Sequence, residues 1–301
     1  MAVSEKGAAM PGPESLPHKV ARRLRWLVRD LRPNRWVERD VAGVRMAMPW
    51  SHRLPDYAKA DPAYGENLLR LAELLAGPEP LQVLDVGANI GDSTLLILDR
   101  VDARVLAVEP DEVFLPFLRH NVRSDARVVV EPALLLAEQS AHGLRSVRVG
   151  GTAAFVRDDS AAGDVPTLTV AELRARHPGF GSLRLVKSDT DGFDVSLVPA
   201  IARAWADVRP VLFFEYDERL TRAAGYDPRR VWDDLAGLGY DDCAVWDNGG
   251  HPLWRTSVAE AARIAEERYP TDRRQFWDVA VAHRDDDAGR AALSSLVPDR
   301  A

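Results

Sequence analysis

Glycines and acidic side chains alternate in one short segment of the chain, Val83-Leu-Asp-Val-Gly-Ala-Asn-Ile-Gly-Asp-Ser-Thr94. An apolar stretch here runs directly into a glycine-containing turn and then into the start of a helix. Gly87 and Gly91 allow close approach of a ligand to the backbone, and packing alone hardly explains both of them. The segment therefore predicts a turn that binds a nucleotide cofactor, with Asp92 as either a ligand contact or a helix cap.

The spacing of these glycines separates two classes of cofactor. A dinucleotide turn has the pattern Gly-x-Gly-x-x-Gly, in which the second glycine makes room for a pyrophosphate. This chain has Gly-x-x-x-Gly. Asp85 is placed to orient the amino group of an amino-acid moiety, and Glu109, at the end of the next strand, can accept both hydroxyls of a ribose. Together these residues favour S-adenosylmethionine (SAM) over a dinucleotide.

Four motifs resemble those of the FkbM family of SAM-dependent methyltransferases, and the resemblance covers roughly residues 64–215. They are Asp85-Val-Gly-Ala-Asn-Ile-Gly-Asp92, Val108-Glu-Pro110, Leu118 to Asn121 and Val186-Lys-Ser-Asp-Thr-Asp-Gly-Phe193. The resemblance implies an α/β protein with the Rossmann-like class I methyltransferase fold. Its mostly parallel seven-stranded sheet has one antiparallel strand and helices on both faces. The resemblance also implies O-methylation of hydroxyls on sugars or polyketide-type natural products.

The resemblance places the cofactor on the two strand ends already singled out. It carries the family's cofactor contacts over position for position, except that Ala133 matches more loosely. Tyr64 is included because the helix that it opens borders the methionine end of the cofactor in the family. The predicted cofactor residues are Tyr64, Asp85, Gly87, Ala88, Asn89, Gly91, Ser93, Glu109, Pro110 and Ala133.

Carboxylates near two further strand ends are the candidates for catalysis. Active sites of parallel sheets assemble at the carboxyl ends of the strands, so Asp189, Asp191 and Glu215 should face one cleft. They can act as a general base toward a substrate hydroxyl, or jointly hold a Mg²⁺ ion that lowers the pKa of that hydroxyl. The family shows Asp-x-Glu-Gly here, so the shorter Asp191 keeps the charge but reaches less far. Alternatively, Asp191 only makes a turn.

Histidine is the other natural base, and two histidines lie in segments that suit a sugar pocket. His52 lies in Trp50-Ser-His-Arg-Leu-Pro-Asp-Tyr57, and His251 lies in Asp247-Asn-Gly-Gly-His-Pro-Leu-Trp254. Aromatic faces and planar polar groups bind hydroxylated rings, so both histidines are kept as catalytic candidates. Surface histidines without a catalytic role are the commoner case.

The elements that must position these residues alternate between short apolar strands and amphipathic helices, which predicts a mostly parallel sheet. Residues 1–17 are predicted to be disordered, 18–76 to form an N-terminal helical region on the substrate side, and 285–301 to form a polar tail. Residues 77–284 form the SAM-binding domain, with an inserted hairpin near 144–156. Strands are predicted at 81–86, 104–109, 127–131, 183–189, 211–215, 242–246 and 276–283.

Composition limits the partners. The net charge is −7 and basic residues cluster only near the N-terminus, which argues against nucleic acid as a partner. No apolar run is long enough to span a membrane, no export signal is visible, and Cys243 is the only cysteine, so a cytoplasmic protein without an intrachain disulfide is expected. The expected partner is a small molecule or oligosaccharide, and a homo-oligomer is left open.

Two other functions compete with the methyltransferase. A nicotinamide-dependent oxidoreductase would need a different glycine turn and a Tyr-x-x-x-Lys or similar base, and neither occurs at the matching place. A non-catalytic SAM-binding partner protein would tolerate loss of the strand-end carboxylates, yet all of them are present. The sequence therefore favours an enzyme that methylates a hydroxyl of a saccharide or glycosylated natural product, with a polyketide-type hydroxyl as the alternative acceptor.

Overall fold

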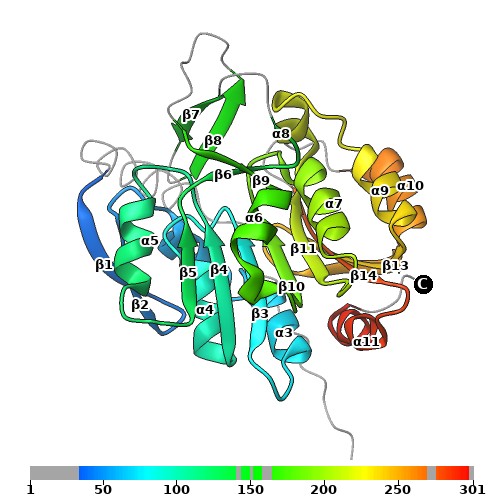
Figure 1. Ribbon diagram of the computed structural model, residues 1–301, viewed down its shortest axis with the longest axis horizontal. Coiled ribbons are helices and arrows are strands. Elements are labelled where there is room, and N and C mark those ends of the chain that lie inside the picture. The colour runs from blue at the N-terminus through cyan, green and yellow to red at the C-terminus, as the bar shows by residue number, and fades with distance from the viewer. Residues whose placement is uncertain (1–33, 140–143, 150–151, 158–164, 270–275, 298–301) are drawn as a thin grey trace, which may run out of the picture.

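The computed structural model describes residues 34–139, 144–149, 152–157, 165–269 and 276–297. At its centre lies an eight-stranded sheet (Figure 1). In chain order its strands are β3 (Leu81–Val86), β4 (Ala103–Val108), β5 (Val128–Glu131), β10 (Leu185–Ser188), β11 (Val211–Tyr216), β12 (Tyr240–Asp247), β13 (Pro252–Ser257) and β14 (Trp277–His283).

The order of the strands across the sheet is β5-β4-β3-β10-β11-β14-β12-β13. The first five of these pair in parallel. Strand β14 is antiparallel to both of its neighbours, β11 and β12, and β13 is antiparallel to β12. The carboxyl ends of β3, β4 and β10 therefore meet at one edge of the sheet, where the predicted site residues should gather.

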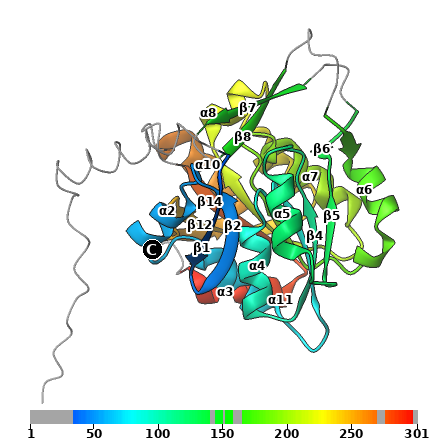
Figure 2. The same cartoon turned by 90° about the vertical axis from the view of Figure 1, so that its left-hand side faces the viewer.

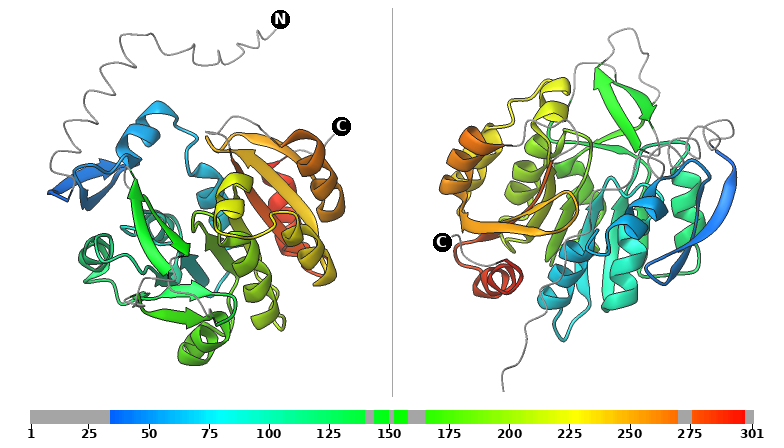
Figure 3. Two further views of the ribbon diagram at one scale, coloured as in Figure 1. Left: turned by 90° about the horizontal axis from the view of Figure 1, so that it is seen from above. Right: turned by 180° about the vertical axis from the view of Figure 1, so that it is seen from behind.

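Helices cover both faces of the sheet because successive residues of a buried strand point to opposite sides. Leu84 and Val86 of β3 belong to the apolar core on one face, and Val83 belongs to the core on the other. The first face is covered by α6 (Val170–Arg176), α7 (Asp194–Ala204), α9 (Arg230–Gly237) and α10 (Val258–Arg268) (Figures 1 and 3). The second is covered by α3 (Glu66–Leu75), α4 (Asp92–Arg100), α5 (Leu115–Val122) and α11 (Asp287–Leu296).

An N-terminal hairpin lies outside the main sheet. Its strands β1 (Trp36–Val41) and β2 (Val44–Pro49) are followed by the short helix α2 (Leu54–Ala60), and together they pack beside α5 (Figure 2). Met46 and Met48 of β2 are buried against Ile90 of the β3–α4 turn and Phe117 of α5, in a third apolar core. The hairpin is thus attached to the turn that was predicted to bind a cofactor.

Smaller elements complete the fold. Strands β6 (Leu134–Leu136) and β9 (Thr167–Thr169) form a parallel pair, and β7 (Leu144–Val149) and β8 (Thr152–Arg157) form an antiparallel pair. The β7–β8 pair stands above the edge where the parallel strands end (Figure 1). The remaining helices are the 3-10 turn η1 (Pro178–Phe180) and α8 (Glu218–Ala223).

The predicted fold class is confirmed, and so is the hairpin near 144–156. The sheet has eight strands where seven were expected, because β13 extends it by pairing with β12. The predicted N-terminal helical region contains α2 and α3, but residues 36–49 of it form the β1–β2 hairpin. The segment 1–17 and the first part of the predicted helical region, 18–33, lie outside the described residues.

The C-terminal region also differs from the sequence prediction. Residues 285–301 were expected to be a polar tail, yet Asp287–Leu296 form helix α11. Ala292, Leu293 and the following Val297 are buried against the sheet, while the acidic residues at the start of the helix face solvent. The high overall polarity of this segment hid one apolar helical stripe.

In the described part of the chain, no helix is both long enough and apolar enough to cross a membrane.

Candidate functional site

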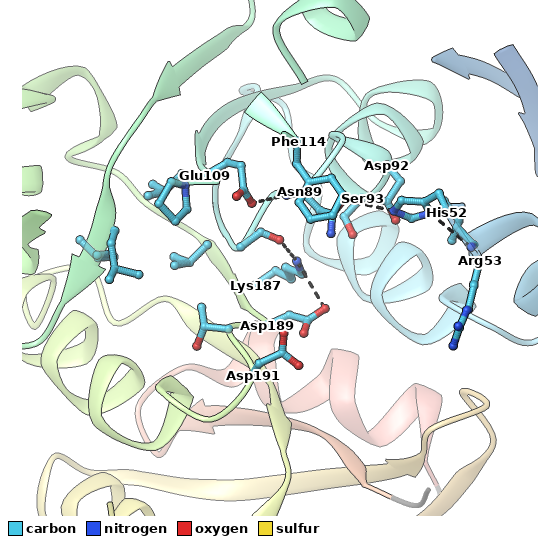
Figure 4. A pocket seen from close by; sticks show the side chains of 18 of the residues that line it. His52, Arg53, Asn89, Asp92, Ser93, Glu109, Phe114, Lys187, Asp189 and Asp191 are labelled. Atoms are coloured by element: carbon cyan, nitrogen blue, oxygen red, sulfur yellow. Dashed lines mark hydrogen bonds and ion pairs between the residues drawn. The ribbon is translucent and has the colours of Figure 1, made fainter. Parts of the chain in front are cut away.

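A cavity opens where β3, β4 and β10 end. The β3–α4 turn, the residues that follow β4 and β10, and the segment 52–64 form its wall (Figure 4). Ten of the predicted site residues line it: His52, Tyr64, Gly87, Asn89, Ser93, Glu109, Pro110, Ala133, Asp189 and Asp191. The topology therefore gathers residues from five separate stretches of the sequence at one cavity.

The other predicted site residues lie outside the lining of this cavity: Asp85, Ala88, Gly91, Glu215 and His251. The structure adds lining residues that the sequence prediction left out: Arg53, Leu54, Tyr57, Val86, Asp92, Val108, Phe114, Leu134, Leu135, Lys187 and Thr190. Lys187 and Thr190 belong to a motif that was recognised. Val86, Val108 and Asp92, which was left open as a ligand contact, also belong to recognised motifs, and Arg53, Leu54 and Tyr57 belong to the segment quoted around His52. Phe114, Leu134 and Leu135 come from segments that no local pattern marks.

The glycines of the β3–α4 turn contact protein, which corrects the expectation that they make room for a ligand. A Cβ on Gly87 would lie 2.0 Å from the carbonyl oxygen of Asp189, and one on Gly91 would lie 2.7 Å from Cδ1 of Leu118. Both glycines also have a left-handed backbone, with φ of 73° and 86°. Packing and conformation together explain why these positions are glycine.

Asp85 does not reach the cavity, so the predicted contact between its side chain and a cofactor amino group is wrong. It is fully buried, and its carboxylate accepts a hydrogen bond of 2.7 Å from the Thr94 hydroxyl. Lys187 lies 3.1 Å from its other oxygen and donates a bond of 2.9 Å to the Gly87 carbonyl. Asp85 and Lys187 therefore link β3, β10 and the turn, and only Lys187 also lines the cavity.

Glu109 follows β4 and forms part of the cavity wall. Each of its oxygens accepts one backbone N–H bond of 2.7 Å, from Asn89 and from Asp111. Burial raises the pKa of this carboxyl to about 8, although the two backbone donors lower it. A carboxylate oxygen accepts more than one hydrogen bond, so Glu109 retains capacity for a diol that donates from the cavity.

Asp189 and Asp191 line the cavity beside Lys187, and Asp92 lines it on another side, near Ser93 (Figure 4). Asp189 lies 3.7 Å from the Lys187 ammonium and its side chain is half exposed. Burial, followed by the neighbouring charge of Asp189, raises the pKa of Asp191 to about 7. Burial raises the pKa of Asp92 to about 6, against the opposing effect of Lys187. A carboxyl group with a pKa near neutrality can exchange a proton with a ligand.

Glu215 lies beside this cavity, not in its lining. It stands opposite Asp278 in the β11–β14 ladder, and Asn67 donates a bond of 2.7 Å to Asp278. Burial raises the pKa of Glu215 well above its usual range and that of Asp278 to about 7, and the charge of Asp189 adds to both effects. Glu215 and Asp278 are thus a pair of partly buried acids outside the lining of the cavity.

The geometry of His52 argues against its predicted role as a base. Its Nδ1 accepts a hydrogen bond of 3.3 Å from the Leu54 N–H, so its Nε2 carries the proton and lies 3.1 Å from Oδ1 of Asn89. Burial lowers the pKa of His52 to about 4. Both ring nitrogens are engaged and the ring is neutral at physiological pH, so it has no free lone pair to accept a proton.

His251 is the other predicted base, and it lies away from the cavity. Its side chain is about half exposed and forms an ion pair of 2.7 Å with Asp61.

The three carboxylates predicted to hold Mg²⁺ are not arranged as a metal site. Among the residues that the structure describes, no group of three or more His, Cys, Asp or Glu side chains is placed to hold a metal ion. Asp189 and Asp191 line the cavity, and Glu215 does not.

The sheet, its helices and the position of the cavity define a Rossmann-like α/β protein of the methyltransferase class of folds. The solved structures to which the chain is similar include a precorrin-6y C5,15-methyltransferase from Geobacter metallireducens, at 12% identity and a TM-score of 0.38. That match covers 72% of this chain and 87% of the other. They also include a SAM-dependent methyltransferase from Agrobacterium tumefaciens, at 11% identity, a TM-score of 0.40, and 82% and 70% coverage.

A methyltransferase FkbM from Methylobacillus flagellatus is similar as well, at 16% identity and a TM-score of 0.32. The match covers 54% of this chain and 39% of that one. No family model matches the chain, and no curated protein matches it. Membership of the FkbM family therefore stays a prediction.

Proposed function

We propose that the chain is a SAM-dependent methyltransferase, and the observation that carries this proposal is the distribution of acids around the cavity. Glu109 lies where a ribose diol is expected, after the second strand of the parallel sheet. Asp92, Asp189 and Asp191 line the same cavity, with Lys187 as a nearby cation. SAM carries a net positive charge, so this acidic cavity is complementary to it.

The same acids argue against a dinucleotide. A dinucleotide places its pyrophosphate at the N-terminus of the helix after the first strand. In this chain that helix, α4, begins with Asp92, whose carboxylate would repel a phosphate.

An orphan group in the wall also fits a polar cofactor. Thr190 Oγ1 is buried, and no hydrogen-bond partner for it exists among the described residues, although Thr190 lines the cavity. A buried hydroxyl without a partner is costly and is explained when a ligand completes it. Glu109, Thr190 and the backbone of the turn would hold SAM, which when bound supplies a methyl group on a positively charged sulfur.

The chain's own residues then have to take a proton from the acceptor. Asp191 is the best placed to do so, because it lines the cavity and its pKa of about 7 suits a base near neutral pH. Lys187 keeps Asp189 and the turn in place through contacts with Asp189 and the Gly87 carbonyl.

The proposed acceptor is a hydroxyl of a saccharide or a glycosylated natural product. Tyr57 and Tyr64 line the cavity with partly exposed rings whose centroids are 5.7 Å apart. Aromatic faces beside carboxylates suit a hydroxylated ring, because the faces cover its C–H groups and the carboxylates accept its O–H groups. A hydroxyl of a polyketide-type molecule is the second candidate, since the same faces also bind apolar carbon.

Calorimetric titration with S-adenosylhomocysteine (SAH) and with NAD tests the cofactor. We expect saturable binding of SAH and none of NAD. Glu109→Ala should weaken SAH binding at least tenfold, because truncating one partner of a buried charged hydrogen bond costs about 1.5–3 kcal/mol. Binding of NAD but not of SAH would refute the proposal. Binding of neither ligand would refute it as well, together with the alternative of a non-catalytic SAM-binding protein.

A further inference from the structure

The cofactor turn is attached to the N-terminal hairpin at two adjacent residues. Asn121 of α5 accepts a bond of 2.8 Å from the Ala47 N–H and donates bonds of 2.9 and 2.8 Å to the carbonyls of Ala47 and Ile90. One residue earlier in the turn, Asn89 contacts His52. Two segments that are distant in sequence therefore hold the turn: His52, which follows the hairpin, contacts position 89, and Asn121 of α5 contacts position 90.

Asn89 has an unusual backbone conformation, which these contacts can stabilise. Its φ is 51°, in the left-handed region that residues other than glycine rarely adopt and that Asn tolerates best. In that conformation its N–H points at Glu109 and donates the bond of 2.7 Å to Oε2. The conformation of Asn89 thus determines one of the two backbone donors that orient the Glu109 carboxylate.

The surroundings of His52 direct its ring toward Asn89. Its side chain is only 7% exposed, and its ring packs edge-on against Phe114 with 6.1 Å between the centroids. Because the Leu54 N–H occupies Nδ1, the Nε2–H is directed at Oδ1 of Asn89. The ring is therefore fixed in orientation and in tautomer by its surroundings, and it can fix the side chain that it contacts (Figure 4).

We propose that His52 is a positioning residue for cofactor binding: it holds Asn89 in the conformation that orients Glu109 toward the cavity. This inference rests on the proposed function for the identity of the ligand, but not for the effect on the turn. It replaces the role of a base, and it makes the N-terminal hairpin part of the cofactor site. His52 neither receives nor gives a proton in this role.

Hydrogen–deuterium exchange of the free protein tests the effect on the turn without any ligand. His52→Phe keeps an aromatic ring in place but removes the bond to Asn89, together with the bond that Nδ1 accepts from the Leu54 N–H. We expect the amides of residues 88–91 to exchange about three- to tenfold faster, the range that one hydrogen bond is worth. His251→Phe is the matched control, because this exposed histidine lies away from the cavity, and it should leave the exchange unchanged.

The affinity for SAH tests the link to the cofactor. His52→Phe should raise Kd by a similar three- to tenfold, since the hydrogen bond that positions Asn89 is lost. His52→Gln should recover part of the affinity, because an amide can still donate to Asn89. In a double-mutant cycle, His52→Phe should add little to Asn89→Gly, which already lacks the acceptor and keeps a left-handed backbone accessible.

Three outcomes would overturn the inference: unchanged exchange in His52→Phe, unchanged SAH affinity with loss of turnover, or effects of His52→Phe and Asn89→Gly that simply add. If His52→Phe does not fold, Asn89→Gly breaks the same bond from its other end and should show the same faster exchange at the turn. Wild-type protein that does not bind SAH, yet shows the expected exchange difference, would refute the proposed function and support the role of His52 in the turn.

Discussion

The two aspartates that follow β10 differ in their surroundings, their exposure and their backbone conformation. Asp189 lies beside Lys187 and is half exposed, while Asp191 has the raised pKa of about 7 and a left-handed backbone with φ of 52°. Such strained conformations concentrate at functional sites. The structure therefore favours Asp191 as the base and gives Asp189 an electrostatic role, whereas the sequence favoured Asp189 and left Asp191 open as a residue that only makes a turn.

This division of roles predicts opposite effects of two matched substitutions. The charge of Asp189 raises the pKa of Asp191, so Asp189→Asn should lower that pKa below 7. Asp191→Asn should remove the titrating group. Carboxyl ¹³C NMR of aspartate-labelled protein measures both, with Asp191 assigned by the resonance that disappears in Asp191→Asn. An unchanged Asp191 titration in Asp189→Asn would show that the two carboxylates do not interact.

At the scale of elements, the β3–α4 turn is held by contacts between protein groups. Because a Cβ on Gly87 would overlap the Asp189 carbonyl, Gly87→Ala must move either the turn or the residues after β10. We expect a loss of about 2 kcal/mol or more in the free energy of unfolding, from left-handed strain and steric overlap together. Urea denaturation of the free protein measures this loss.

Gly77→Ala is the control for that measurement. A Cβ at Gly77 has nothing within 4 Å, and its backbone is not left-handed. We expect its free energy of unfolding to stay within about 0.5 kcal/mol of wild type, as for most surface substitutions. Equal losses in the two variants would mean that the contact between Gly87 and Asp189 does not constrain the turn.

The elements that sequence predicted well share a clear local pattern. Strands β3, β4, β10 and β11 are short apolar runs that end at a turn residue or an acid, so both the strands and the edge at which their acids gather could be anticipated. The β1–β2 hairpin was missed although Ala42-Gly43 forms its tight turn, because a helical pattern was extended across it. The partners of a cavity residue, such as His52 for Asn89, depend on tertiary packing and leave no local signal.

The whole molecule buries several carboxyl groups whose pKa values lie close to neutral, and this has a consequence for stability. Burial is the main cause for Glu109, Asp191 and Asp278, whose pKa values are about 8, 7 and 7. The folded protein keeps these protons at a pH where the unfolded chain, with ordinary carboxyl pKa values, has lost them. Stability must therefore fall as pH rises toward and through these values.

The titration of His52 determines the pH range in which this effect is measured. The pKa of His52 is lowered to about 4, so its contribution has the opposite sign, and it fades once the unfolded chain loses that proton above about pH 6.5. Between pH 7 and 8.5 the carboxyl groups dominate. We expect the free energy of unfolding in urea to fall there, by on the order of 1.4 kcal/mol per pH unit for each proton still held by the folded state.

Glu109→Gln should reduce the slope most near pH 8, because Glu109 has the highest of the three pKa values. Asp287→Asn, at the exposed start of α11, should not change the slope. A stability that stays level or rises across this range would mean that these carboxyl groups are solvated or paired, and therefore already ionised, in the folded protein at neutral pH.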